Sequence, residues 1–170
     1  MNAFLFVDGS CGPRDDVGAW AGIAIMGNKR KLFFGVVGPT TISRCELMPI
    51  IEGLRWIKAN WLPEHPDLEI IVYSDSVYTV KTLSGMYRGR KNTELWVAID
   101  EVSHDLKIKY IWRARNSLFY MSFCDALCGG LRDRLITIIT EQFKDKRTPE
   151  EAIPYSELPE VEDNTLTGGK

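Results

Sequence analysis

The chain has 170 residues, of which 45% are hydrophobic and 26% are charged, and its formal net charge is −2 at pH 7. This length suits one domain with a substantial core, and no apolar run approaches the roughly 18–20 residues needed to span a bilayer. The N-terminus has no basic segment with a cleavage site, and four cysteines make no disulfide framework in a chain of this size. We therefore expect a cytoplasmic protein that does not enter a membrane.

The charge is distributed unevenly. Residues 149–170 contain six acidic residues and one lysine, a net charge of −5, whereas residues 1–148 contain twenty Lys or Arg and seventeen Asp or Glu, a net charge of +3. The composition predicts a folded domain over residues 1–147 and an acidic, flexible tail over residues 148–170. The tail either competes with nucleic acid for a basic surface or is a solvated terminus without a role.

Strand-like segments come first along the chain. Residues 3–7, 18–26 and 31–37 read as three strands, and the turn Gly27-Asn28 joins the second to the third as a hairpin. The segments that follow alternate between helices and strands. They are a helix over 44–60, a strand over 68–73, helices near 75–84 and 93–104, a strand over 107–112 and a helix near 120–145. This order predicts an α/β fold with a mixed five-stranded sheet flanked by helices.

Four acidic residues stand in apolar surroundings: Asp8, Glu46, Asp75 and Asp125. A carboxylate in such a place is costly unless it is paired, protonated or bound to a cation. If the four converge, they form a site for hard divalent metal ions, and Mg²⁺ or Mn²⁺ suits their oxygen ligands better than zinc does. The residues thus favour a two-metal phosphoryl hydrolase. The alternative is four separate surface or capping acids, with Asp75 as a helix N-cap.

The segments around these acids occur in a recognisable order. They are Asp8-Gly9-Ser10, Arg44-Cys45-Glu46-Leu47-Met48, Ser74-Asp75-Ser76, Asn92-Thr93-Glu94-Leu95-Trp96 and Cys124-Asp125-Ala126-Leu127. Over roughly residues 3–145 the chain resembles the type I ribonuclease H family. Each segment alone is weak, whereas the ordered set is specific.

The resemblance implies a ribonuclease H-like fold and a metal-dependent endonuclease. By that resemblance, Asp8, Glu46, Asp75 and Asp125 hold two Mg²⁺ or Mn²⁺ ions, and the substrate is the RNA strand of an RNA–DNA hybrid. Cleavage would leave 5′-phosphate and 3′-hydroxyl ends. The hybrid would be distinguished by its 2′-hydroxyl groups across a wide, shallow minor groove.

Further residues are implied to bind substrate. Ser10 lies in the first motif, and Thr41, Arg44 and Asn92 match residues that the family places around a phosphate of the DNA strand. Asn92 also fits a helix cap. Trp96 matches a core aromatic of the family, as does Trp112.

The chain departs from the family in two places. The loop 113–117 lacks the histidine that many members carry, and Arg115 stands near that position. A guanidinium cannot act as a base, but it can stabilise phosphate charge; otherwise Arg115 is a solvated loop charge. Only sixteen residues separate Asp75 from Asn92, so we expect no basic protrusion there, and hence weaker, more salt-sensitive substrate binding.

The cysteines lie close to the proposed site acids along the chain: Cys11, Cys45, Cys124 and Cys128. A zinc or redox role is conceivable, and core packing is what we expect.

The sequence therefore predicts a monomeric endoribonuclease acting on RNA–DNA hybrids. A catalytically silent module of the same fold, which binds nucleic acid or a protein partner, is the alternative. A third hypothesis retains the catalysis with a different nucleic-acid substrate, although nothing in the sequence indicates the extra domains or dimer interface that such enzymes use.

Overall fold

The computed structural model describes residues 1–12, 17–88 and 91–144, the last four of these by their backbone only. The chain divides into two units, Met1–Ile136 and Thr137–Lys170, and the site described below lies in the first. The predicted acidic tail, with its boundary at residues 147 and 148, falls outside the described residues. No helix in the described ranges is long and apolar enough to cross a membrane.

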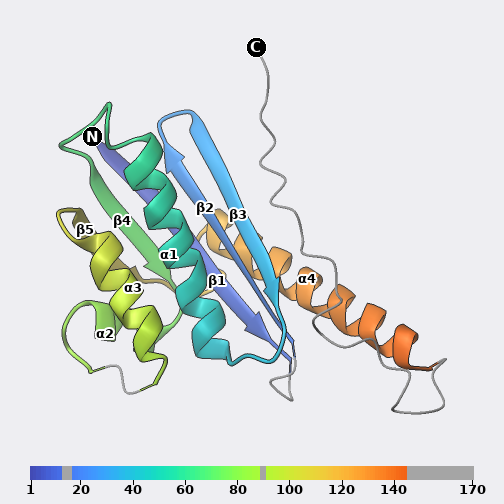
Figure 1. Ribbon diagram of the computed structural model, residues 1–170. Helices are drawn as coiled ribbons and strands as arrows, with labels where there is room; N and C mark the ends of the chain where they lie inside the picture. The colour runs from blue at the N-terminus through green and yellow to red at the C-terminus, as the bar shows by residue number, and fades with distance from the viewer. Residues whose placement is uncertain (13–16, 89–90, 145–170) are drawn as a thin grey trace. The chain divides into compact units, whose positions relative to one another are not determined.

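A mixed five-stranded sheet forms the centre of the first unit, as predicted (Figure 1). Its strand order is β3-β2-β1-β4-β5. Strands β1, β2 and β3 pair antiparallel, whereas β4 lies parallel to both β1 and β5. The strands are β1 (Asn2–Cys11), β2 (Gly18–Met26), β3 (Lys29–Val37), β4 (Glu69–Ser74) and β5 (Lys107–Trp112).

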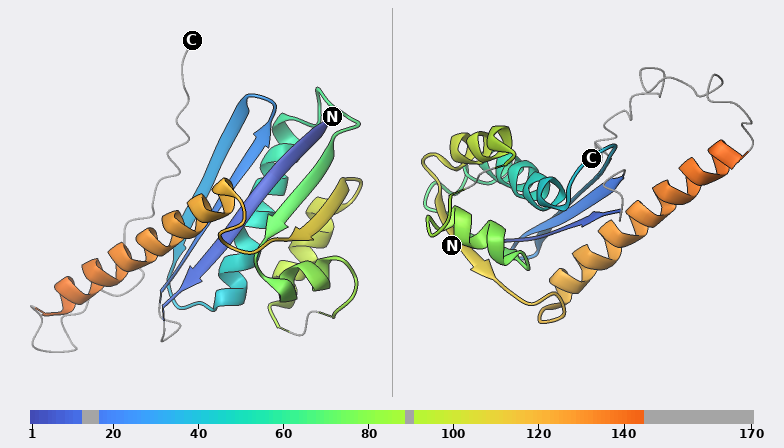
Figure 2. Two further views of the ribbon diagram at one scale, coloured as in Figure 1. Left: turned by 180° about the vertical axis from the view of Figure 1, so that it is seen from behind. Right: turned by 90° about the horizontal axis from the view of Figure 1, so that it is seen from below.

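Helices cover both faces of this sheet (Figures 1 and 2). They are α1 (Ile42–Asn60), α2 (Val77–Leu83), α3 (Thr93–Ser103) and α4 (Phe119–Lys144). Helices α1 and α3 pack in one core cluster, while the first half of α4 packs in a second. Each element lies within a few residues of its predicted position.

The two clusters follow from the alternation of side chains along β1. Leu5 and Val7 are fully buried beneath α1, whereas Phe6, between them, points to the opposite face and packs with residues of α4. Burying an aliphatic or aromatic side chain of this size contributes about 1.5–3 kcal/mol. Because both faces of β1 are buried, its register is strongly fixed, and the polar residues at its end are held in place.

β1 continues four residues beyond its predicted end. The predicted range ended with the apolar run at Val7, and Asp8 was expected to lie on the same strand. In the structure, Asp8 and Ser10 pair with Ala21 and Ala19 of β2. The first motif is therefore part of a strand rather than a loop.

Trp112 is not a core residue, contrary to the prediction. It ends β5 at the edge of the sheet, where it is 45% exposed. Its indole N–H donates a hydrogen bond of 2.9 Å to the backbone carbonyl of Asp75. Trp96 does pack, partly buried, against the first core cluster.

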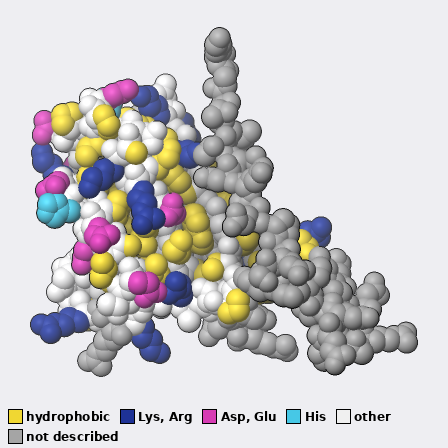
Figure 3. Space-filling view, in the orientation of Figure 1, with side chains coloured by type: hydrophobic (Ala, Val, Ile, Leu, Met, Phe, Trp, Pro, Cys, Tyr) yellow, Lys and Arg dark blue, Asp and Glu magenta, His cyan; other side chains and the backbone are white. Residues whose placement is uncertain are grey.

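The face of the molecule seen in Figure 3 carries charges of both signs, interspersed with apolar groups. The described residues of this face therefore form no extended surface of one charge.

Candidate active site

Asp8, within β1, and Asp75, directly after β4, lie side by side where the pairing of these two parallel strands ends. The register of β1 and β4 pairs Phe6 with Tyr73, and each aspartate lies two residues further along the chain. Burial, followed by the charge of Asp75, raises the pKa of Asp8 from its ordinary value of 3.8 to about 7. Asp8 is only 3% exposed, so the fold places its carboxylate beside a second negative charge where water is scarce.

Gly9 allows helix α1 to approach this pair of strands. A Cβ atom at Gly9 would lie 2.5 Å from the carbonyl carbon of Cys45 and 2.6 Å from the backbone nitrogen of Glu46. Only a residue without a side chain allows the strand and the helix to touch there. The contact places the backbone of Glu46 against the residue that follows Asp8.

Thr79 holds the Glu46 carboxylate. Its hydroxyl donates a hydrogen bond of 3.1 Å to Glu46 Oε2, and the Thr79 residue is only 1% exposed. Burial raises the pKa of Glu46, and hydrogen bonds from Ser76 and Thr79 oppose that rise. Thr79 was not predicted from the sequence, because the local sequence does not show which side chain a threonine in a short helix contacts.

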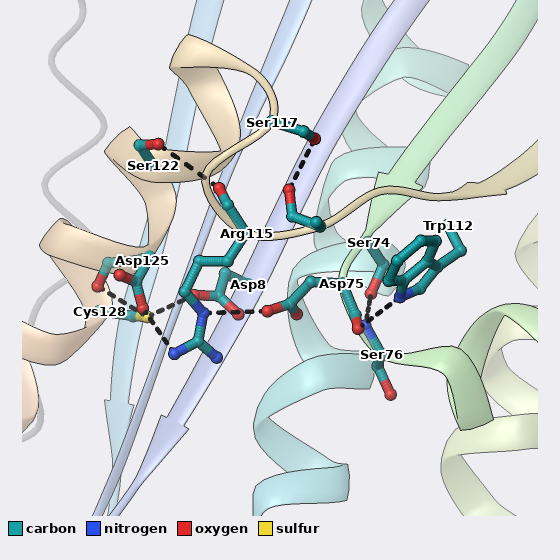
Figure 4. Close-up of polar contacts among 11 residues, drawn as sticks. Asp8, Ser74, Asp75, Ser76, Trp112, Arg115, Ser117, Ser122, Asp125 and Cys128 are labelled. Atoms are coloured by element: carbon teal, nitrogen blue, oxygen red, sulfur yellow. Dashed lines mark hydrogen bonds and ion pairs between the residues drawn. The ribbon is translucent and has the colours of Figure 1, made fainter.

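Ser76, rather than Asp75, is the N-cap of α2. The Ser76 hydroxyl accepts a hydrogen bond from the backbone N–H of Thr79, at 3.3 Å. The alternative role of Asp75 as a cap is therefore wrong. Its carboxylate is instead directed toward Arg115 (Figure 4).

Arg115 joins Asp75 to the fourth acid, Asp125 on α4. Its Nε donates to Asp75 Oδ2 at 3.0 Å, and its Nη1 lies 3.3 Å from Asp125 Oδ1 (Figure 4). Desolvation acts to lower the pKa of Arg115, but the hydrogen bond to Asp75 and the charges of Asp8, Asp75 and Asp125 outweigh it and raise the pKa. Arg115 is thus paired with site acids, and it is not merely a solvated loop charge.

The four acids are therefore gathered from four elements, and their chemistry fits a hard divalent ion. All of them offer oxygen ligands, and a cation bound beside the buried Asp8 would favour its ionised form, because burial and the charge of Asp75 raise its pKa to about 7. Within the described ranges, however, no three Asp, Glu, His or Cys side chains already stand where they could hold a metal ion. Asp75 and Asp125 would have to exchange the Arg115 guanidinium for metal.

A second group of predicted residues meets at the N-terminus of α3. Arg44 Nη1 lies 3.4 Å from Asn92 Oδ1 and also pairs with Glu94. Asn92 adopts a left-handed backbone conformation, with φ of 58°, and its side chain makes no capping hydrogen bond. Asn92 is thus the N-cap residue of α3, as the alternative prediction had it, but it caps the helix without its side chain. Thr41 is exposed at the N-terminus of α1, three residues before Arg44.

Ser10 accepts a hydrogen bond from Arg132, a residue that was not predicted from the sequence. Arg132 Nη1 donates a hydrogen bond of 2.6 Å to Ser10 Oγ, across the gap between α4 and β1. Ser10 and Arg132 both line a cleft of about 510 Å³. Two residues of the site, Arg115 and Asp125, line the same cleft. The cleft is lined by Gly9, Ser10, Cys11, Ile42, Arg115, Asp125, Ala126, Gly129, Gly130, Arg132 and Asp133.

Three of the four cysteines are core residues, as expected. Cys45, Cys124 and Cys128 are fully buried, whereas Cys11 is only partly buried. Burial raises the pKa of the Cys124 thiol to about 12 and also raises that of Cys128. Cys128 additionally contacts the site, since its thiol donates to Asp8 Oδ2 at 3.5 Å.

The chain is similar in sequence to known proteins of one family. The family model described as RNase H matches residues 1–126. The chain is 32% identical over 132 residues to ribonuclease HI of Campylobacter jejuni, with 72% of this chain and 86% of that relative covered.

Two solved structures are similar in fold. LC11-RNase H1, solved in complex with an RNA/DNA hybrid, superposes with a TM-score of 0.69 at 16% identity, covering 79% of this chain and 99% of that one. The N-terminal RNase H domain of a Mycobacterium tuberculosis protein superposes with a TM-score of 0.70 at 17% identity, covering 82% and 99%.

Proposed function

The chain belongs to the ribonuclease H family of endonucleases, and we propose that it hydrolyses the RNA strand of RNA–DNA hybrids at a two-metal site. The observation that carries this proposal is the grouping of Asp8, Asp75 and Asp125 around Arg115, with Glu46 close enough to interact with Asp75. The expected products are 5′-phosphate and 3′-hydroxyl ends.

The four acids are the proposed ligands of two Mg²⁺ or Mn²⁺ ions. When bound, the ions would activate a water molecule and neutralise charge on the scissile phosphate. The protein's own contribution is positioning: β1 and β4 fix Asp8 and Asp75, and Thr79 orients Glu46 through its hydrogen bond. Such outer contacts commonly matter about 10–100-fold for metal affinity or activity.

Arg115 is proposed to act on the substrate phosphate. Its guanidinium already lies between Asp75 and Asp125, so it would face a phosphate bound at these acids. A guanidinium offers several N–H donors and stays charged, which suits the stabilisation of phosphate charge and excludes general-base catalysis.

The remaining predicted residues would position the two strands. Arg44, Asn92 and Thr41 would bind a phosphate of the DNA strand, and the Arg44–Asn92 contact supports a shared site. Arg44 would exchange its ion pair with Glu94 for that phosphate. Ser10, at the end of β1 near Asp8, would contact the RNA strand.

We further propose that the chain acts as a monomer in the cytoplasm. None of its four cysteines forms a disulfide, which suits a reducing compartment. The molecular mass in solution, measured by light scattering, tests the first part; a dimer would contradict it.

Cleavage of a labelled RNA–DNA hybrid tests the function. The assay includes Mg²⁺ or Mn²⁺, with RNA–RNA, DNA–DNA and single-stranded RNA as competing substrates and the Asp75→Asn variant in parallel. We expect metal-dependent loss of the hybrid's RNA strand alone, abolished by the substitution. Hybrid binding without cleavage under either metal would instead favour a catalytically silent module.

A further inference from the structure

Helix α4 carries a face that extends from the proposed metal site along the cleft. Asp125, Gly129 and Arg132 are spaced i, i+4 and i+7, so they share one side of the helix. All three line the cleft, together with Arg115. The proposed function gives a role to the acid and to Arg115, but none to Gly129 or Arg132.

The guanidinium of Arg132 is held in a fixed orientation at this cleft. One nitrogen donates to Ser10 Oγ at 2.6 Å, while Nε and Nη2 donate to Asp133 Oδ1 at 2.8 and 2.6 Å. The Arg132 side chain is 28% exposed. A planar, permanently charged group that is already oriented loses little further entropy when it binds an anion.

Two glycines, Gly129 and Gly130, lie within the continuous helix between Asp125 and Arg132. A Cβ atom at either Gly129 or Gly130 would meet nothing within 4 Å. Packing therefore does not require glycine here, although each glycine costs a helix interior about 0.5–1 kcal/mol relative to alanine. Their effect on the surface is to leave the helix backbone bare where it borders the cleft.

We propose that this face of α4 binds the sugar–phosphate backbone of the cleaved strand next to the scissile position. Arg132 binds a non-bridging phosphate oxygen, and the bare backbone at Gly129 and Gly130 gives the strand room to approach. Arg132 is a positioning residue, because Arg115 rather than Arg132 lies among the acids. The inference rests on the proposed function and adds to it a phosphate contact on α4.

The first test compares Arg132→Gln with Arg134→Gln. Arg134 is an exposed arginine on the same helix and is not among the described residues that line the cleft, so its substitution changes net charge equally. Hybrid binding is measured in the Asp75→Asn background, where cleavage does not interfere. We expect Arg132→Gln to weaken binding about tenfold and to reduce the slope of log affinity against log salt by about one.

Kinetics of the otherwise unaltered enzyme provide a second measurement. Because Arg132 does not touch the reacting atoms, its loss should raise KM more than it lowers kcat. Arg134→Gln should leave both close to the parent values.

The glycines are tested by Gly130→Glu against Gly130→Gln. Both side chains have similar size and similar helix propensity, and both should stabilise the helix relative to glycine. We expect the glutamate variant to bind hybrid several-fold more weakly than the glutamine variant at low salt, because it adds negative charge facing the phosphates. Equal binding by the two variants would overturn the proposed path of the strand.

Arg132 has a purely structural alternative, in which it only fastens α4 to β1 through Ser10. In that case Arg132→Gln lowers the melting temperature but leaves the salt slope equal to that of Arg134→Gln, which overturns the inference and leaves the proposed function intact. A parent protein that binds no hybrid overturns both.

Discussion

Asp8 combines burial with the charge of Asp75, and both raise its pKa, to about 7. The folded state therefore favours the protonated form of Asp8. Below pH 3.8, the ordinary pKa, this carboxyl is protonated in the unfolded state as well, so its burial does not reduce stability there. The stability of the metal-free protein should fall as the pH rises from about 4 through about 7. Asp8→Asn removes this dependence, and we expect it to stabilise the metal-free protein at pH 8.5 by about 1–3 kcal/mol.

The melting temperatures of Asp8→Asn and the parent protein, compared at pH 4 and pH 8.5 with a chelator, measure this effect. The difference between the two proteins should be larger at the higher pH. An equal difference at both values would show that folding does not raise the pKa of Asp8. Addition of Mg²⁺ should reduce the advantage of the variant, since the parent alone has the full set of carboxylates.

Thr79 offers a second prediction at the scale of one residue. Replacement by valine preserves its shape and removes the hydroxyl that donates to Glu46. We expect Thr79→Val to lower apparent Mg²⁺ affinity in the cleavage assay by about tenfold, with little change in hybrid KM. Thr82→Val, on the same helix, is a suitable control because the Thr82 hydroxyl has no hydrogen-bond partner in the described structure. If the two variants needed the same Mg²⁺ concentration, Thr79 would have no positioning role.

Among the elements, the contact between β1 and α1 depends on Gly9. A methyl group there would overlap backbone atoms of Cys45 and Glu46, so the helix must move away from the strand. We expect Gly9→Ala to destabilise the protein by about 1–3 kcal/mol and to lower cleavage by displacing Glu46. Gly130→Ala should have the opposite effect on stability, because its methyl group meets nothing within 4 Å and favours the helix by up to about 1 kcal/mol.

Chemical denaturation of the two alanine variants checks both signs. If both substitutions destabilised the protein equally, a close approach of β1 and α1 would not explain the glycine at position 9. Restored activity of Gly9→Ala at high Mg²⁺ would indicate that Glu46 is displaced but still able to bind metal.

The strands and helices were predictable because their signals are local. The apolar run of β2 and the apolar period of α1 lie within single segments, and those elements were found to within two residues. The end of β1 was not, because its pairing with β2 overrides the turn-like composition of Asp8-Gly9-Ser10. Trp112 was misplaced for a related reason: its exposure follows from the edge position of β5, which a segment alone does not reveal.

The acids of the candidate site could be proposed from the sequence, whereas their supporting contacts could not. Carboxylates in apolar segments are visible in sequence, because burial of an unpaired charge is costly. The partners of these acids and of Ser10 are distant in the chain: Thr79 lies 33 residues from Glu46, and Arg132 lies 122 residues from Ser10. Only the fold brings such residues together, so neither contact was predicted.

For the whole molecule, the proposed substrate contacts involve few cations. No helix separates α2 from α3 among the described residues of that connection, 84–88 and 91–92, in keeping with the expected lack of a basic protrusion. If Arg44, Arg115 and Arg132 each neutralise one phosphate, the duplex value of 0.9 per contact predicts a slope near −3 for log affinity against log salt. Hybrid affinity of Asp75→Asn should then fall roughly 40-fold between about 50 and about 200 mM salt. An affinity that barely changes over this range would contradict the assignment.

The predicted acidic tail, residues 148–170, gives a second prediction for the whole molecule. Replacing its six acids, Glu150, Glu151, Glu157, Glu160, Glu162 and Asp163, by their amides changes the net charge of the chain from −2 to +4. If the tail competes with the hybrid for basic residues, the amide variant should bind several-fold more tightly at low salt, and the advantage should disappear at about 0.5 M salt, where screening extends over only a few ångströms. Titration of labelled hybrid with both proteins in the Asp75→Asn background measures this. Equal affinities at every salt concentration would identify the tail as a solvated terminus, because a competing polyanion must lose its effect as salt rises.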